Sequence, residues 1–166
     1  MVSNRRRSGT ESAEGAAQAG RQSHDANGYS IDWSVKITMR DGVTLIARAY
    51  FPRSTSPRAI LATVTPYGAH RQHHLAKLFA LHGYAAYVVN SRGRGGSEGT
   101  FEPSIQEVED GHDIVEWLWA QHGGVRKVAT WGMSNSGAAQ WATAKGQTPH
   151  LSTIVLVDSP LQGMNT

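Results

Sequence analysis

Short, almost wholly apolar runs alternate with amphipathic segments through most of the chain. Such runs are typical of strands that are buried on both faces of a sheet. They lie at residues 59–64, 84–89, 127–131 and 153–157. Strands that alternate with helices form a mostly parallel sheet, and its crossover connections are right-handed. The sequence therefore predicts an open α/β fold with three layers.

Helical patterns occupy the segments between these runs. Residues 105–121 have the clearest signals, because Ser104 and Glu107 have the spacing of a capping box and a glycine pair follows the segment. We expect its buried face to consist of Ile105, Val108, His112, Val115, Leu118 and Trp119. Two further helices are predicted at residues 71–82 and 135–145.

The amino-terminal part of the chain divides at about residue 30. Residues 31–51 predict an antiparallel hairpin, because apolar residues alternate on both sides of an Asp-Gly turn. Residues 1–29 are rich in glycine, alanine, serine and mixed charge, a composition typical of a disordered leader. We therefore expect a leader at 1–29 and a folded domain at 30–166.

Composition excludes several classes of protein. No apolar run approaches the roughly 18–20 residues that span a membrane. The absence of cysteine excludes disulfides, thiolate metal sites and a cysteine nucleophile. The net charge of +3 comes with one basic run, Arg5–Arg7, and no aromatic residues interleave with it. Because no apolar export segment follows these arginines, we expect a cytoplasmic protein without membrane or nucleic-acid partners.

The carboxyl ends of parallel strands are where an open α/β sheet binds ligands. The loop after residues 127–131 places Ser134 between Gly132 and Gly137, and a helix follows. This pattern is typical of a nucleophile elbow, in which the N–H of Asn135 faces an oxygen that becomes negative. The second glycine falls one position late, so an ordinary strand-to-helix turn remains open as an alternative. Ser136 is not the central serine of the elbow, because an elbow centred there would need glycine at position 134, where this chain has serine.

Two other patterns point to no cofactor and no metal. The glycine-rich loop at 90–99 lacks the dinucleotide fingerprint, because Glu98 stands where the third glycine belongs. His70, His73 and His74 have helical spacing, but no acidic residue lies near them in sequence. A hydrated helix start is the favoured interpretation for them, with substrate contact as the functional alternative.

Several loops taken together resemble the cocaine esterase / X-Pro dipeptidyl-peptidase family of serine hydrolases. The match covers about residues 35–157, and its segments occur in the family's order. They are Met39 to Val43 with Leu45, Thr65 to Gly68, Arg92 to Gly95 with Ser97 to Gly99, Glu109 to Gly111 with Asp113, Glu116 to Leu118, and Trp131 to Gly137 with Gln140 and Trp141. This family places the second glycine of its elbow late, as this chain does.

The resemblance implies that residues 30–166 are the N-terminal part of an α/β-hydrolase domain, truncated after about the sixth strand. It implies that Ser134 is the nucleophile. It also implies that the Tyr67 hydroxyl and the Asn135 backbone N–H form the oxyanion hole. Tyrosine usually stands at position 135 in the family, so Asn135 changes the pocket wall more than the chemistry. Aspartate is favoured at position 90, so Asn90 alters the polar network expected around Arg92. For Arg92 and, with it, Arg94, Glu109 and Asp110, we expect a structural role in holding loops.

The resemblance also implies that the triad aspartate and histidine are not in this chain, because family members carry them in later parts of the sequence. His150 and Asp158 match non-catalytic positions, and His150 precedes a strand on the wrong edge for catalysis. We therefore expect a hydrolase of esters or amides, of the acyl-ester, X-Pro peptide or acylated β-lactam type, that is inactive as this chain alone. A non-catalytic fragment or binding module is the alternative. An exposed strand edge would favour a homo-oligomer or a complementing chain.

Overall fold

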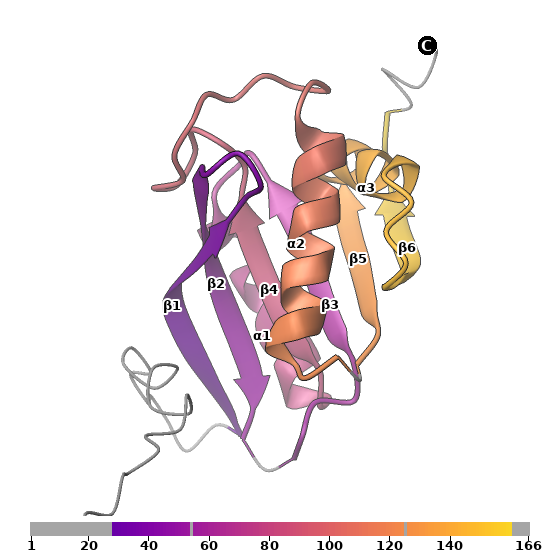
Figure 1. Ribbon diagram of the computed structural model, residues 1–166. Coiled ribbons are helices and arrows are strands. Elements are labelled where there is room, and N and C mark those ends of the chain that lie inside the picture. Colours follow the sequence, from indigo (N-terminus) through magenta and orange to yellow (C-terminus); the bar gives the residue numbers. More distant parts are fainter. Residues whose placement is uncertain (1–27, 54, 125, 161–166) are drawn as a thin grey trace, which may run out of the picture.

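The computed structural model describes residues 28–53, 55–124 and 126–160. These residues form a six-stranded sheet with helices on both faces (Figure 1). The strands are β1 (Tyr29–Thr38), β2 (Thr44–Pro52), β3 (Ile60–Thr65), β4 (Ala85–Asn90), β5 (Val128–Met133) and β6 (Leu151–Val157). The helices are α1 (His73–Leu81), α2 (Glu107–Gln121) and α3 (Asn135–Lys145), and a 3₁₀ turn, η2 (Ala69–Gln72), precedes α1. The predicted three-layer α/β architecture is confirmed.

The strand order in the sheet is β1-β2-β4-β3-β5-β6. The hairpin strands β1 and β2 are antiparallel, and β2 joins β4 in antiparallel fashion. From β4 to β6 all neighbours are parallel. Because parallel strands end at the same edge, the loops that follow β3, β4, β5 and β6 lie at one end of the sheet.

Each face of the sheet has its own apolar core. On one face α2 and α3 cover the sheet, and Ile114, Val115 and Leu118 of α2 pack there against the strands. On the other face α1 supplies Ala76 and Ala80 to a second cluster. Every residue of β4 is buried, as the almost wholly apolar sequence of this strand predicts. Among the described residues, no helix is both long and apolar enough to cross a membrane.

Among the described residues, β6 is an edge strand of the sheet, and it is far less covered than the central strands. Val155 and Val157 are 54% and 53% exposed, and no residue of β6 is charged. Edge strands are usually protected by charges, bulges or a covering element. The exposed apolar edge predicted from the sequence is therefore present in the structure.

Some element boundaries differ from the sequence predictions. The leader predicted at 1–29 lies outside the described residues except for Gly28 and Tyr29, and Tyr29 already belongs to β1. Helix α2 begins at Glu107 instead of residue 105, because Ser104 has a positive φ of 67°. Only half of the capping box forms, since the Glu107 carboxylate accepts the Ser104 N–H but no side chain caps the helix.

The predicted buried face of α2 is partly wrong. Ile105 is 66% exposed, because it lies before the helix in the loop. Asp110 and Gly111 occupy the buried face in addition to Val115 and Leu118. Gly111 is required there, because a Cβ at this position would overlap the Thr143 side chain of α3.

The polar residue Arg92 is buried just beyond the end of β4, at the edge where the parallel strands end. Its side chain is 7% exposed, and its Nε and Nη2 donate to the Asp110 carboxylate of α2 at 2.6–3.1 Å. Nη1 reaches Asp41 of the β1–β2 turn at 2.6 Å. The hydrogen bond to Asp110 and the contact with Asp41 raise the pKa of Arg92 above its ordinary value, despite burial. Arg92 and Asp110 therefore have the structural role that the sequence predicts.

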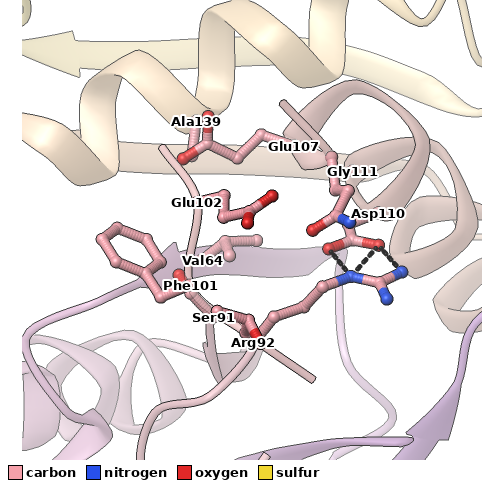
Figure 2. Close-up of a pocket in the computed structure, with 11 residues that line it drawn as sticks. Val64, Ser91, Arg92, Phe101, Glu102, Glu107, Asp110, Gly111 and Ala139 are labelled. Atoms are coloured by element: carbon pink, nitrogen blue, oxygen red, sulfur yellow. Dashed lines mark hydrogen bonds and ion pairs between the residues drawn. The ribbon is translucent and has the colours of Figure 1, made fainter. Parts of the chain in front are cut away.

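Figure 2 shows this ion pair beside a small pocket. The cavity has about 20 Å³, which is room for one water molecule, and Phe101 and Ala139 are among its lining residues. The Glu107 carboxyl group also borders it, and burial raises the pKa of this group. The pocket is thus part of the packing between α2, α3 and the loop after β4.

Replacing Arg92 should destabilise the fold strongly. Arg92→Leu leaves the Asp110 carboxylate buried without its cation, which costs about 3–5 kcal/mol of unfolding free energy. Arg94→Leu is the matched control, because Arg94 lies over the Phe101 ring at 4.9 Å and such a contact contributes about 0.5–1 kcal/mol at an exposed site. Urea unfolding followed by circular dichroism measures the unfolding free energy of both variants. Equal losses in the two variants would contradict the structural role of the buried pair.

Candidate active site

Ser134 stands at a sharp turn between β5 and α3. Its backbone has φ 55° and ψ −124°, a conformation that residues with a side chain rarely adopt. The N–H groups of Gly137 and Ala138 donate to the Ser134 carbonyl at 2.9 and 3.0 Å and so begin the helix. Ser134 is exposed at the carboxyl end of β5. This is the backbone geometry of the elbow that the sequence predicts.

The two glycines of the turn are required by space. A Cβ at Gly132 would overlap the carbonyl oxygen of Ser136, and one at Gly137 would lie 2.6 Å from the Cβ of Ser159. The second glycine therefore falls at 137 because this is where the first turn of α3 meets the segment after β6. Ser136 is fully buried, which removes it as a rival nucleophile.

The neighbouring strand β6 and the residue after it hold the backbone of Ser134. The N–H of Ser134 donates to the carbonyls of Val157 and Asp158, both at 3.1 Å. Asp158 has a positive φ of 45°, and it touches Ser134 through its backbone. These carbonyls were not identified from the sequence, because backbone contacts between distant segments have no residue signature.

The Tyr67 hydroxyl lies between the Ser134 hydroxyl and the Asn135 N–H. The Tyr67 Oη lies 3.4 Å from Ser134 Oγ, and the Asn135 N–H points at Tyr67 Oη from 3.4 Å. Both distances exceed the usual ranges, which are about 2.5–3.0 Å for O–H···O and about 2.7–3.2 Å for N–H···O, so both contacts are weak and both donors are available to another oxygen. Tyr67 is 46% exposed and comes from the loop after β3. The structure thus brings together all three residues that the sequence singled out for catalysis.

None of the described histidines is hydrogen-bonded to Ser134, and His150 and His73 have other partners. His150 precedes β6 at the opposite edge of the sheet, where it contacts Glu116 at 2.7 Å and stacks on Trp119. His73 Nδ1 lies 3.0 Å from the Tyr50 hydroxyl, and burial lowers the pKa of this imidazole. The hydrated helix start is therefore wrong for His73. Among the described residues, no histidine hydrogen-bonds Ser134, and no cluster of at least three histidine or acidic side chains is arranged to hold a metal.

Asn90 has a different role from the one that the sequence suggests. Arg92 bonds to Asp110 and Asp41, and none of the bonds made by the Asn90 side chain involves Arg92. The Asn90 amide instead accepts the N–H of Ala69, two residues beyond Tyr67. The asparagine at position 90, where the family favours aspartate, therefore contacts the loop that carries Tyr67.

Gly132→Ala should distort the elbow. The added methyl overlaps the Ser136 carbonyl, and overpacking of this kind costs about 1–3 kcal/mol. Gly123→Ala is a suitable control, because a Cβ at Gly123 has nothing within 4 Å, while the positive φ of 70° there strains an alanine without any overlap. Both variants should lose stability, but only Gly132→Ala should shift the amide resonances of Ser134. An unchanged Ser134 resonance in Gly132→Ala would contradict this account of the turn.

Comparison with known proteins agrees with this geometry. Residues 41–165 match the family described as X-Pro dipeptidyl-peptidase (S15 family). The chain is 31% identical over 122 residues to cocaine esterase from Rhodococcus sp. (strain MB1 Bresler), which covers 70% of this chain and 21% of the relative.

Solved structures show the same fold. An α-amino acid ester hydrolase superposes with a TM-score of 0.70 at 24% identity, over 80% of this chain and 26% of that one. A CocE/NonD family hydrolase from Staphylococcus aureus gives a TM-score of 0.68 at 20% identity, over 76% and 27%. The chain thus spans about a quarter of the length of these relatives. It belongs to the X-Pro dipeptidyl-peptidase (S15) family of hydrolases and has the α/β-hydrolase fold.

Proposed function

We propose that this chain supplies the nucleophile and the oxyanion hole of a serine hydrolase that cleaves esters or amides through an acyl-Ser134 intermediate. The observation that carries the proposal is the position of the Tyr67 hydroxyl at the strained turn, where it points at Ser134 Oγ and is itself approached by the Asn135 N–H. A serine in this position, with two donors beside it, is suited to attack a carbonyl carbon.

The reaction follows from the positions of these groups. Ser134 Oγ attacks the carbonyl carbon and gives its proton to a general base, while the carbonyl oxygen becomes negative and accepts from Tyr67 and Asn135. The tetrahedral intermediate then expels an alcohol or an amine, which takes the proton from the base. Water cleaves the acyl-Ser134 ester in the second half of the reaction and frees the acid.

The general base comes from outside the described residues in this proposal. No described histidine bonds to Ser134, and Asp158 meets the nucleophile only through its backbone carbonyl. Loss of the serine or histidine of a triad costs on the order of 10⁶ in kcat. These residues alone should therefore turn over substrates far more slowly than a complete triad does.

The names of the relatives support the substrate class. One relative is a cocaine esterase and one structural neighbour is an α-amino acid ester hydrolase, while the family is described by X-Pro dipeptidyl-peptidase activity. An acyl-enzyme mechanism serves ester and amide bonds alike, because both present a carbonyl carbon with a leaving group. We therefore extend the proposal to acyl esters and X-Pro peptides as substrates.

A fluorophosphonate probe tests the nucleophile directly. Imidazole in solution can replace a missing histidine base, so the chain should gain one adduct by intact mass when imidazole is present. Ser134→Ala should remove the adduct, and Ser56→Ala should keep it, because Ser56 is exposed in the distant loop between β2 and β3.

Two results would contradict parts of this proposal. A folded chain that forms no adduct even with imidazole would contradict the acyl-Ser134 mechanism and favour the non-catalytic binding module. An adduct that forms equally fast without imidazole would contradict a base outside the described residues.

Tyr67→Phe should slow the same labelling reaction. Removal of one oxyanion-hole donor costs about 10²–10³ in rate, and the Tyr67 hydroxyl is the side-chain donor nearest Ser134 Oγ. Tyr84→Phe is the control, since Tyr84 lies before β4 at the other end of the strand. Both variants are compared by the second-order rate constant for adduct formation by the fluorophosphonate in the presence of imidazole. Equal rates for Tyr67→Phe and the unaltered chain would remove Tyr67 from the oxyanion hole.

A further inference from the structure

Asn90 is the last residue of β4 and is 4% exposed. Its side-chain amide lies among three segments that are far apart in sequence. Oδ1 accepts the Ala69 N–H at 2.8 Å, and Nδ2 donates to the carbonyls of Ile46 at 3.1 Å and Gly95 at 3.2 Å. Acceptor and donors are all in use, as burial requires of a polar group.

The glycine-rich loop after β4 closes around this amide. Gly95 has φ 53°, and a Cβ there would overlap the Asn90 side chain. The Ser97 hydroxyl donates to the Asn90 carbonyl at 2.9 Å and accepts the Ile46 N–H at 2.8 Å. The amide is therefore fixed on two sides by β2 and by its own loop, and its acceptor arm is directed at the loop after β3.

That loop carries Tyr67 and is held at both ends. The Tyr67 N–H donates to Thr65 Oγ1 at 3.2 Å, and Thr65 is the neighbour of Asn90 across the parallel pair β3–β4. Beyond Tyr67, Gly68 has φ 91° and Ala69 is fixed by Asn90 Oδ1. The chain reverses between these two attachments, and the Tyr67 hydroxyl is directed at Ser134 from that reversal.

From this arrangement we infer that Asn90 is a positioning residue: its Oδ1 holds the Ala69 N–H and so sets the place of the Tyr67 hydroxyl beside Ser134. The catalytic meaning of this inference rests on the proposed function. The two donor bonds have another task, which is to hold the amide between Ile46 and Gly95. An aspartate, the residue that the resemblance favours here, keeps the acceptor for Ala69 and loses both donors.

The acceptor and donor roles of the Asn90 amide can be separated by substitution. Asn90→Leu removes every polar atom of the side chain at similar size, and Asn90→Asp keeps the acceptor. Asn90→Ala serves in place of Asn90→Leu if the leucine prevents folding. Ile114→Ala is the matched control, because Ile114 is 1% exposed in the core between α2 and the sheet and its truncation costs stability without touching the Tyr67 loop.

The first measurement is the rate of Ser134 labelling by the fluorophosphonate with imidazole, each variant being compared at equal folded fraction. Loss of a hydrogen bond to a buried group predicts that labelling falls about tenfold in Asn90→Leu. Asn90→Asp should stay within about threefold of the unaltered chain because the acceptor remains, and Ile114→Ala should not change the rate. Equal losses in Asn90→Leu and Asn90→Asp, or no loss in either, would overturn the inference.

The second measurement does not need activity. Amide hydrogen exchange of Ala69, followed by NMR, should quicken about tenfold in Asn90→Leu and remain slow in Asn90→Asp. The ring resonances of Tyr67 should respond to an added Ser134→Ala change in the unaltered chain and in Asn90→Asp, but not in Asn90→Leu. If the unaltered chain takes no label, the proposed function fails while these NMR results still decide the role of Asn90. Unchanged Ala69 exchange in Asn90→Leu would overturn that role.

Discussion

The charge of Arg92 is buried at the edge where the parallel strands end, and it must be neutralised there. Asp110 on α2 and Asp41 on the hairpin turn do this together, so one guanidinium joins three parts of the chain. The strands alone would leave their connecting loops free to move over this edge. With Arg92 in place, the loop after β4 has a fixed path, and the next layer of contacts, around Asn90, can form on it.

The backbone of Ser134 is restrained from several directions. Ser134 has a backbone conformation that costs on the order of 1–3 kcal/mol, and the carbonyls at the end of β6 and the first turn of α3 hold it there. Tyr67 approaches from the loop after β3. The connections after three strands, β3, β5 and β6, therefore form the site together, and for this reason it lies where parallel strands end rather than on any single element.

Patterns with a local cause were predicted well from the sequence. The apolar runs gave the central strands, and glycines at 132 and 137 marked the elbow, because each follows from burial or space near that residue. The prediction that Ile105 lies on the buried face of the helix was wrong. Its spacing fits the helix, but Ser104 has a positive φ and α2 begins only at Glu107. The role of Asn90 was not predictable, because its three partners lie on segments that only the folded sheet brings together.

The bonds from the Ser134 N–H to the carbonyls of Val157 and Asp158 also affect the order in which this part of the chain folds. During synthesis on the ribosome, β5 and the serine emerge before the residues that fix the serine's backbone. Until β6 docks, the turn can relax to a less strained conformation, and the hydroxyl is not yet presented. The strained backbone conformation of Ser134 is therefore fixed only once β6 has docked.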